Sequence, residues 1–301
     1  MIVVTGASGA IGGRLVERLL AEGERPVVTG RRPEALRRRW PDLEALELDV
    51  LDPATLPDAL RGATCAYYLV HSMEPGAGSF AERDARGARA FARAALDAGV
   101  ERVVYLGGLG YRDQELSEHL RSRQETGRIL AADGPPLLEL RAAVVIGPES
   151  ASFRMLTDLV RRLPAMVVPR WVDTPSQPIA IDDVIAYLSA ARGVAMPTRH
   201  TIVEIGGPDV VTYRDMIQLV AAETGRARLI VGVPLLTPRL SSYWTALTTD
   251  VPMAVTRPLI DGMSVPLVLR DPDTARRLFP GIEPLGFREA LRRALAASDE
   301  A

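Results

Sequence analysis

Short apolar runs alternate with longer amphipathic stretches along residues 1–148 of the chain. The runs are rich in Val, Ile and Leu and are bounded by Gly, Pro or polar residues, which is typical of strands. The stretches between them repeat apolar residues at helical spacing. Strands that alternate with helices predict a parallel sheet with helices on both faces, a doubly wound α/β fold. The expected strands are residues 2–5, 26–30, 43–48, 64–70, 102–106 and 137–146.

The amphipathic stretches predict helices between these strands. In the first of them, Ile11, Leu15 and Leu19 share one face and Gly23 provides a stop. After residue 148 the alternation loosens, but two segments there still have helical patterns, so the C-terminal half is expected to be folded. The expected helices are residues 10–22, 33–39, 53–60, 80–97, 115–132, 179–191 and 213–224.

A glycine-rich turn, Gly6-Ala7-Ser8-Gly9-Ala10-Ile11-Gly12, joins the first strand to the first helix. Glycines at this spacing let the backbone approach a pyrophosphate closely, and the helix N-terminus adds oriented N–H groups and positive potential. Strand, turn and amphipathic helix occur together here, which is far more specific than glycines alone. The sequence therefore predicts a Rossmann-type dinucleotide site. Its expected pyrophosphate ligands are Gly6, Ser8, Gly9, Ala10, Ile11 and Gly12.

The residues after the second strand indicate which dinucleotide this site takes. NAD-selective sites have a carboxylate here, which binds the ribose hydroxyls and would repel a 2′-phosphate. This chain has Arg31 and Arg32 instead. A charge-assisted hydrogen bond from a guanidinium contributes about 1.5–3 kcal/mol, equivalent to about tenfold or more in affinity. We therefore expect NADP(H) as the cofactor, with the alternative that either arginine is solvated surface charge.

Two further segments lie where the adenosine half of the cofactor is expected. Asp49 and Val50 follow the third strand, and Asp49 either accepts a hydrogen bond from the adenine amine or caps the next helix. Leu69, Val70 and His71 end the fourth strand, beside the expected ribose and pyrophosphate, because ligands bind at the carboxyl ends of strands in such sheets. The alternative for His71 is an inert loop residue.

These assignments divide the chain into two parts. Residues 1–148 are expected to form the NADP(H)-binding Rossmann core. Residues 149–301 are expected to contribute late Rossmann elements and a small C-terminal cap over the substrate. The length of 301 residues fits one dinucleotide-binding domain with such a cap.

Charge and composition argue against several other classes of protein. A formal net charge of −2 does not suit a nucleic-acid partner, which calls for a basic excess. Cys65 is the only cysteine, so neither an internal disulfide nor a cysteine-based zinc site is expected. The apolar runs are well short of the roughly 20 residues of a membrane-spanning helix, and no signal peptide is evident. We therefore expect a cytoplasmic protein without a transmembrane anchor or a metal.

Together with three later segments, the glycine-rich turn resembles the atypical and extended short-chain dehydrogenase/reductases. The resemblance is to their NmrA-like branch and the related nucleotide-binding accessory subunit of respiratory complex I. The later segments are residues 94–100, 179–184, and 205–208 with Thr212-Tyr213. The resemblance spans most of the chain and implies an NAD(P)-binding Rossmann fold. In active members it also implies a catalytic Ser, Tyr and Lys, the last two spaced as YxxxK.

The chain departs from that catalytic set at all three positions. Gly107 and Gly108 stand where the Ser is expected, and the following helix has His119 and Arg123 at the Tyr and Lys positions. The chain contains no lysine and no asparagine. In the family, the lysine lowers a phenol pKa of about 10, and without it proton transfer costs about 4 kcal/mol at neutral pH. That mechanism is therefore absent from this chain.

Histidine offers another route for the proton. Its ordinary pKa of about 6.5 suits a general acid, so His119 is expected to protonate a substrate oxygen unaided. Arg123 is always charged and is expected to hold the nicotinamide ribose, since it cannot relay protons. The alternative for His119 is an inert surface residue. Tyr111, in the loop after the glycine pair, is a second candidate proton donor.

Other polar and aromatic residues have simpler interpretations. Asp182 and Asp183 are expected to cap a helix and tie the cap to the sheet rather than to bind a metal. The arginines at positions 37–39 are expected to form a solvated helix face. Trp171 and the pair Tyr243-Trp244 either line an apolar substrate pocket or pack in the core.

Three functions fit these features. The first is an NADP(H)-dependent oxidoreductase that acts on a small apolar carbonyl or quinone-like substrate. The second is a non-catalytic NADP(H)-binding sensor or regulator, which the missing Ser-Tyr-Lys set favours. The third, an accessory protein that docks on a membrane complex, is supported only by the resemblance and by the proline-rich segment 229–240. The sequence determines neither the small-molecule substrate nor the oligomeric state.

Overall fold

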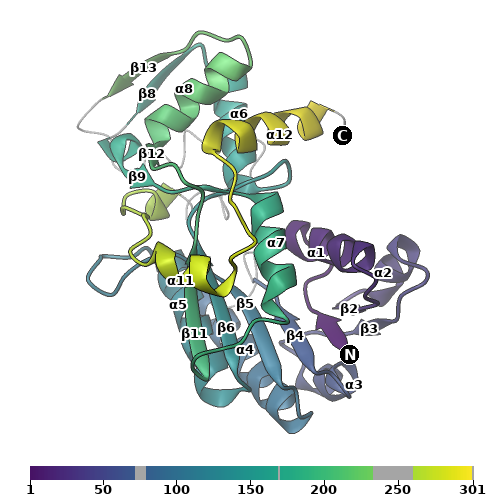
Figure 1. The fold of residues 1–301 in the computed structure, drawn as a ribbon. Helices are drawn as coiled ribbons and strands as arrows, with labels where there is room; N and C mark the ends of the chain where they lie inside the picture. The colour runs from purple at the N-terminus through teal and green to yellow at the C-terminus, as the bar shows by residue number, and fades with distance from the viewer. Residues whose placement is uncertain (72–78, 169, 233–259, 300–301) are drawn as a thin grey trace.

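A parallel sheet of seven strands forms the centre of the computed structural model, which describes residues 1–71, 79–168, 170–232 and 260–299 (Figure 1). The strands are β1 (Ile2–Val4), β2 (Val27–Gly30), β3 (Ala45–Glu47), β4 (Cys65–Tyr68), β5 (Arg102–Gly108), β6 (Leu137–Ala142) and β11 (His200–Ile205). Their order is β11-β6-β5-β4-β1-β2-β3. The order reverses at β1, and doubly wound sheets bind their ligands at that point.

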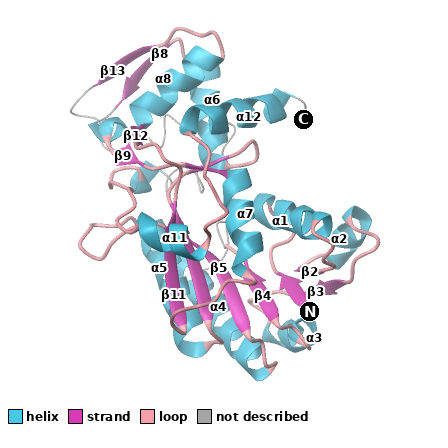
Figure 2. Cartoon of the chain, in the orientation of Figure 1, coloured by secondary structure: helices cyan, strands magenta, loops and turns pink. Residues whose placement is uncertain are grey.

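Helices cover both faces of the sheet, as Figure 2 shows. Val4 faces one apolar core and Val3 the other, because alternate residues of a strand point to opposite faces. The first core includes residues of α1 (Ala10–Ala21), α2 (Pro33–Arg39), α7 (Ile181–Ala191) and α11 (Pro272–Leu278). The second includes residues of α3 (Leu56–Leu60), α4 (Phe80–Asp97) and α5 (Glu118–Asp133). The predicted doubly wound Rossmann fold is confirmed.

A further apolar core lies outside the sheet, among helices of the C-terminal half. It includes Phe153, Met216 and Leu291, all nearly inaccessible to solvent, from α6 (Ala151–Arg162), α8 (Tyr213–Glu223) and α12 (Phe287–Asp299). These helices gather in the upper part of Figure 1, away from the main sheet. Strand β11 and helix α7 come from the same half of the chain but belong to the sheet and its covering layer.

The predicted elements are found with changes at their ends. The strand expected at 137–146 is two strands: β6 ends at Ala142, and β7 (Val145–Ile146) pairs with β10 (Ile179–Ala180) in a separate small sheet. Helix α7 consequently begins at Ile181 and not at residue 179. Helix α5 begins at Glu118, because the Ser117 hydroxyl accepts a hydrogen bond from the Leu120 amide and caps the helix there. The helix expected at 53–60 is divided into the 3-10 helix η1 (Pro53–Thr55) and α3.

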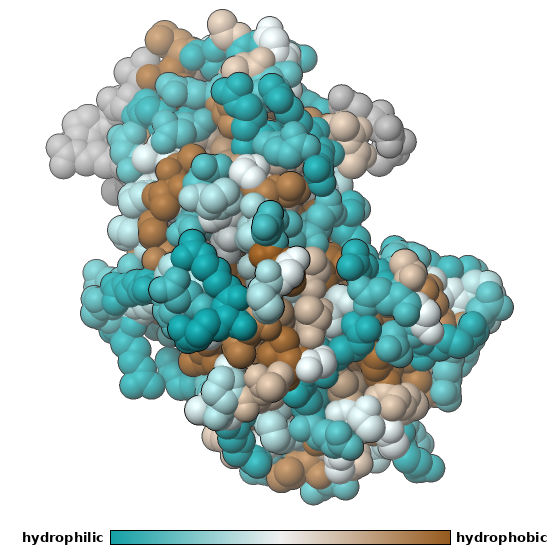
Figure 3. Space-filling view, viewed as in Figure 1, coloured by the Kyte–Doolittle hydropathy of each residue, from teal (hydrophilic) through white to brown (hydrophobic). Residues whose placement is uncertain are grey.

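Two small sheets complete the C-terminal half. Strand β9 (Pro175–Ser176) pairs with β12 (Val211–Thr212), and β8 (Ala165–Val168) pairs with β13 (Leu229–Gly232). Hydrophobic and hydrophilic residues are interspersed on the face seen in Figure 3. Among the described residues, no helix combines the length and the apolar character needed to cross a membrane.

Candidate functional site

The glycine-rich turn follows β1 at the carboxyl edge of the sheet. Gly6 has a φ of +68°, and a Cβ there would lie 2.6 Å from the carbonyl oxygen of Leu69. A Cβ at Gly12 would lie 2.3 Å from the carbonyl oxygen of Gly6. Both positions therefore require glycine, since any side chain would collide with backbone.

The N-terminus of α1 lies at the end of this turn. Gly9 precedes the helix, and its first turn has neither a side-chain cap nor an acidic residue. Ser8 and Gly9 are exposed, and Ala10 and Ile11 are half-buried. The first N–H groups of a helix have no partner within the helix, so they can donate to an anion. The turn therefore has the shape and the donors that a pyrophosphate requires.

Hydrogen bonds tie the end of β4 to the turn. The Thr5 hydroxyl donates to the Tyr67 carbonyl oxygen at 2.7 Å and accepts from the Leu69 amide at 3.2 Å. Leu69 and Val70 are half-buried, and Leu69 lies against Gly6 of the turn. His71, two residues beyond Leu69, therefore lies near the point where the strand order reverses. The contact of Leu69 and Val70 with the cofactor stays a prediction.

The arginines expected at the 2′-phosphate lie directly after β2. Arg31 and Arg32 are exposed, and β2 is the parallel neighbour of β1, so both follow the same edge of the sheet as the turn. The arginines at 37–39 are exposed on α2, as predicted. The side chain of Arg39 nevertheless covers the start of α1, since a Cβ at Gly13 would lie 2.8 Å from its Nη1.

The two residues expected near the adenine have different surroundings. Asp49 is half-buried, and its Oδ1 accepts a hydrogen bond from the Leu51 amide at 2.9 Å. The alternative that Asp49 caps the next helix is wrong, because Asp52 caps η1. Val50 is buried and packs against Gly87 of α4, where a Cβ would lie 2.7 Å from Val50 Cγ2.

A chain of hydrogen bonds joins Asp84, His71 and His119. Asp84 Oδ2 lies 2.9 Å from His71 Nδ1, and His71 Nε2 lies 3.3 Å from His119 Nδ1. The Ser122 hydroxyl also donates to Asp84 Oδ2, at 3.1 Å. Asp84 is 5% exposed and lies on α4, whereas His119 and Ser122 lie in the first turns of α5. The fold thus brings one predicted cofactor residue, His71, against the predicted proton donor, His119.

Burial lowers the pKa of both histidines. For His119 the pKa falls to about 3, because burial disfavours the charged ring and the positive groups of His71 and Arg123 add to the effect. For His71, burial lowers the pKa more than the hydrogen bond to Asp84 raises it. The expected pKa near 6.5 for His119 is therefore wrong. His119 is neutral at pH 7 and has no extra proton to give by itself.

Arg123 is held against the end of β5. Its guanidinium donates to the Leu106 carbonyl oxygen and lies 4.9 Å from the centroid of the Tyr105 ring. The Tyr105 hydroxyl in turn donates to the Arg123 carbonyl oxygen at 2.9 Å. These contacts fix the position of the guanidinium near the carboxyl edge of the sheet.

Of the two glycines at the family's Ser position, Gly107 lies beside a buried carboxylate. A Cβ at Gly107 would lie 3.1 Å from Glu139 Oε1, and Glu139 is fully buried. Glu139 accepts hydrogen bonds from Arg141 Nε at 2.7 Å and from the ring of His200 at 2.8 Å. A side chain at position 107 would therefore be crowded against Glu139. This cluster was not predicted from the sequence, although Glu139 and Arg141, two charged residues within strand β6, were a signal for it.

Tyr111, the second candidate proton donor, has a structural role. Its single O–H proton is shared between Glu204 Oε2 at 2.9 Å and the Val268 carbonyl oxygen at 2.8 Å, and its oxygen accepts from the Arg270 amide at 2.9 Å. Burial and the neighbouring Glu204 raise its pKa. The residue thus ties the loop after β5 to the segment before α11, and its proton is not available for transfer.

The paired aspartates lie in the first turn of α7. Neither forms a capping hydrogen bond, so that part of the prediction is wrong. Asp183 Oδ2 accepts from the Leu285 amide at 2.8 Å, and Asp182 lies 3.7 Å from Arg14 of α1. They therefore connect α7 to the segment before α12 and to α1. Within the described part of the chain, no group of residues has the composition of a metal site.

The roles expected for the aromatic candidates stay predictions. Trp171 lies in the 3-10 helix η2 (Arg170–Asp173), and Tyr243 and Trp244 lie outside the described residues.

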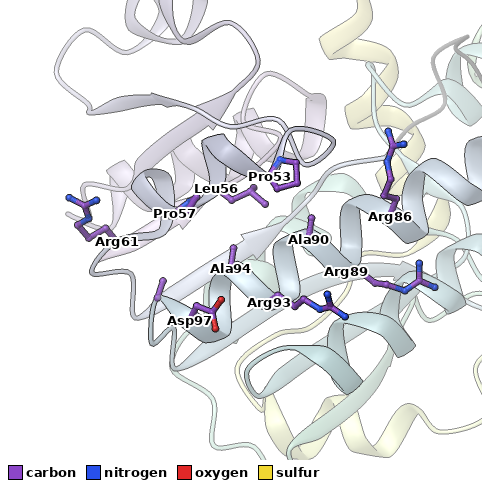
Figure 4. A pocket seen from close by; sticks show the side chains of 11 residues that line it. Pro53, Leu56, Pro57, Arg61, Arg86, Arg89, Ala90, Arg93, Ala94 and Asp97 are labelled. Carbon is purple, nitrogen blue, oxygen red and sulfur yellow. The ribbon is translucent and has the colours of Figure 1, made fainter.

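A groove of about 690 Å³ runs between α3 and α4, and none of the predicted site residues lines it. Figure 4 shows its floor of Leu56, Ala90 and Ala94, with arginine side chains around it.

Known proteins resemble this chain in both sequence and fold. Residues 6–135 match the family described as NAD(P)H-binding. The chain is 29% identical over 193 residues to the ceramide reductase of Caulobacter vibrioides. The matched region covers 63% of this chain and 60% of that protein. It is 28% identical over 230 residues to the (4-alkanoyl-5-oxo-2,5-dihydrofuran-3-yl)methyl phosphate reductase of Streptomyces griseus, covering 75% of this chain and 74% of the relative.

Two solved structures share the fold over nearly the whole chain. The triphenylmethane reductase of Citrobacter sp., solved with NADP(H), has a TM-score of 0.76 at 17% identity and covers 97% of this chain and 99% of its own. The UDP-glucose 4-epimerase of Thermotoga maritima has a TM-score of 0.73 at 16% identity, with 99% and 98% covered. The predicted NAD(P)-binding Rossmann fold is confirmed, and the chain has a binding domain for a nicotinamide cofactor.

Proposed function

Because residues 6–135 form an NAD(P)H-binding domain, we propose that this protein is an NADP(H)-dependent oxidoreductase that reduces the carbonyl of a small, largely apolar substrate. One observation carries the proposal. His119 contacts His71, and His71 follows the strand whose Leu69 abuts the glycine-rich turn. A nitrogen that exchanges protons therefore lies at the same edge of the sheet as the pyrophosphate site.

The chain's own residues fit the cofactor at both ends. The backbone of the turn from Gly6 to Gly12 holds the pyrophosphate, and the exposed Arg31 and Arg32 hold the 2′-phosphate. Asp49 would accept a hydrogen bond from the adenine amine through Oδ2, because its Oδ1 accepts from the Leu51 amide. When bound, the nicotinamide ring supplies the hydride.

The remaining site residues act on the substrate side. His119 exchanges a proton with the substrate oxygen. Arg123 holds the nicotinamide ribose, because a guanidinium has five N–H donors and its contact with Leu106 does not use them all. The helices α6, α8 and α12 of the C-terminal half form the cap over the substrate.

The reductive direction is favoured by the relatives. Two of them are named as reductases, one of ceramide and the other of an alkanoyl-oxo-dihydrofuranyl methyl phosphate. Both names describe substrates with apolar portions, which agrees with the apolar carbonyl substrate expected from the sequence. The substrate of this chain is proposed to share that chemical character.

A sensor or regulator is the second candidate function. It is favoured by the glycines at the family's Ser position, where Glu139 would crowd a side chain at position 107, and by the absence of lysine. Such a protein would bind the cofactor at the same turn and would not transfer hydride.

Turnover separates the two candidates. The full-length protein is mixed with NADPH and a panel of aldehydes, ketones and quinones, and NADPH oxidation is followed by absorbance. Oxidation that depends on the carbonyl and is lost in His119→Ala supports the reductase. Tight NADPH binding without oxidation in any mixture supports the sensor and contradicts the reductase.

A further inference from the structure

The hydrogen bonds around Asp84 determine where each proton sits. A carboxylate only accepts hydrogen bonds, so His71 Nδ1 carries the proton at the 2.9 Å contact. A neutral imidazole has one N–H, and His71 Nε2 therefore bears a lone pair. That lone pair accepts from His119 Nδ1 at 3.3 Å, which must also be protonated. His119 Nε2 is consequently left with its lone pair.

The outer nitrogen of His119 is thus a proton acceptor. Both rings are neutral at pH 7, because burial lowers the pKa of each. In the part of the chain that the structure describes, no hydrogen-bond partner is found for His119 Nε2. The Asp84 carboxylate therefore sets the tautomer of a ring that it does not touch, acting through His71.

Building on the proposed reductase function, we infer that Asp84, His71 and His119 form a proton relay that ends at the reacting oxygen. In alcohol oxidation, the substrate O–H bond breaks and its proton passes to His119 Nε2. The electron pair left on the oxygen forms the C=O bond as the carbon gives its hydride to the oxidised nicotinamide cofactor. The proton on His119 Nδ1 passes to His71 Nε2. His119 is then neutral again, and His71 is an imidazolium beside the Asp84 carboxylate.

Carbonyl reduction uses the same protons in reverse. First, a proton from solvent binds His119 Nε2, and the proton on His119 Nδ1 passes to His71 Nε2. His71 is then an imidazolium, and neutral His119 carries its proton on Nε2. As the hydride of the nicotinamide cofactor reaches the carbonyl carbon, the oxygen takes a proton from His119 Nε2. His119 Nδ1 is replenished from His71 Nε2, and both rings end neutral. His119 alone touches the substrate, whereas His71 and Asp84 are positioning residues.

The charges around the two rings favour storage of the proton on His71. His71 contacts the carboxylate of Asp84 on α4, and that carboxylate also accepts from Ser122. Among the described residues, none places a carboxylate in contact with His119, and Arg123, on the same helix, disfavours the cationic form of its ring. The nearby phenols Tyr68 and Tyr105 stay neutral because burial raises the pKa of each.

A histidine pair would thus replace the tyrosine and lysine of the family. The phenol of that set is activated by an ammonium, and this chain has no lysine. Here the proton comes from a stored imidazolium instead. Carbonyl reduction should therefore slow as the pH rises above the pKa of His71, by about tenfold per pH unit.

Substituting His71 separates the relay from a purely structural role. In His71→Gln, the amide oxygen can still accept from His119 Nδ1, but an amide cannot carry the proton. The three histidines are also few enough for their ring nitrogens to be assigned by NMR. His200→Gln is the matched control, because that ring contacts a different buried carboxylate, Glu139.

The relay predicts two results. In the wild-type protein without substrate, the NMR spectra show the Nδ1–H form of both His71 and His119, opposite to the form that free histidine favours. His71→Gln keeps the Nδ1–H form of His119 and keeps NADPH binding, but carbonyl reduction falls by about tenfold or more and loses its pH dependence. His200→Gln changes neither the tautomers nor the rate.

Other results would overturn the relay. An Nε2–H proton on His119 excludes it, whether or not the enzyme turns over. Full activity in His71→Gln also excludes it, because that ring would then transfer no proton. Should the protein bind NADPH and reduce no carbonyl, the proposed reductase fails and the tautomers still decide whether the hydrogen-bond chain exists.

Discussion

Gly12 and Gly6 lie so close together that a Cβ at Gly12 would be 2.3 Å from the carbonyl oxygen of Gly6. This contact closes the turn between β1 and α1. It leaves the helix N-terminus with backbone N–H groups and no side chain in front of them. The proposed pyrophosphate site thus depends on the absence of a side chain at two positions.

Gly12→Ala is therefore expected to weaken nucleotide binding. The added methyl group must push the turn open, and such overpacking costs about 1–3 kcal/mol. The Kd for NADPH should rise by about tenfold or more, as measured by the fluorescence of the bound nucleotide. Gly281→Ala is the control, because a Cβ there meets nothing within 4 Å. Equal affinity in Gly12→Ala and the wild type would show that the nucleotide does not use this turn.

Removing the arginine after β2 should change the choice of nucleotide. In Arg31→Ala, the ratio of the Kd for NADH to that for NADPH is expected to fall by about tenfold, because one charge-assisted hydrogen bond to the 2′-phosphate is lost. Arg32→Ala tests the second guanidinium in the same way. Arg38→Ala is the matched control, since Arg38 is exposed on α2. An unchanged ratio in both Arg31→Ala and Arg32→Ala would remove the basis for NADP(H).

Local patterns predicted the sheet and the turn well. Strand and helix periodicity, with a glycine stop after α1, was enough to locate β1, α1 and β2, because each depends on residues close in sequence. The split of the segment at 137–146 was missed. It depends on pairing of Val145 with Ile179, a partner more than thirty residues away that a local pattern does not show.

The partners of the site residues were harder to find. His71 and His119 were each identified, but their contact joins a loop after β4 to the first turn of α5. Asp84 was missed, although it shares the apolar face of α4 with Ala88 and Phe91, a buried position unusual for a carboxylate. The lowered pKa of His119 could not be predicted either, because burial is a property of the folded chain.

The buried histidines should make the protein sensitive to acid. A ring whose pKa is lower in the folded than in the unfolded state binds fewer protons when folded. Above about pH 6.5 the ring is neutral in both states, so it does not destabilise the fold. As the pH falls from about 6.5 toward about 3, the unfolded chain gains the proton and the folded chain does not. The free energy of unfolding therefore falls by at most about 1.4 kcal/mol per pH unit. In His119→Gln, the free energy of unfolding should fall less steeply with decreasing pH. Urea unfolding across this range measures both slopes, and parallel curves would contradict the lowered pKa.

The ion cluster at Glu139 should contribute to stability. Burial alone would raise the pKa of Glu139, but hydrogen bonds from His200 and Arg141 keep it lowered. Arg141→Met leaves the buried carboxylate short of a partner, so the free energy of unfolding should fall by about 3 kcal/mol. Arg128→Met, which breaks an exposed pair with Glu125, should cost less than about 1 kcal/mol. Similar losses of unfolding free energy in the two variants would show that the buried cluster stabilises the fold no more than an exposed ion pair does.

Calorimetric titration of the 301-residue protein with NADPH and with NADH tests whether the glycine-rich turn and the arginines after β2 bind this cofactor. We expect a one-to-one complex with each nucleotide, with NADPH bound about tenfold or more tightly than NADH. No heat and no complex with either nucleotide at high protein concentration would contradict this expectation.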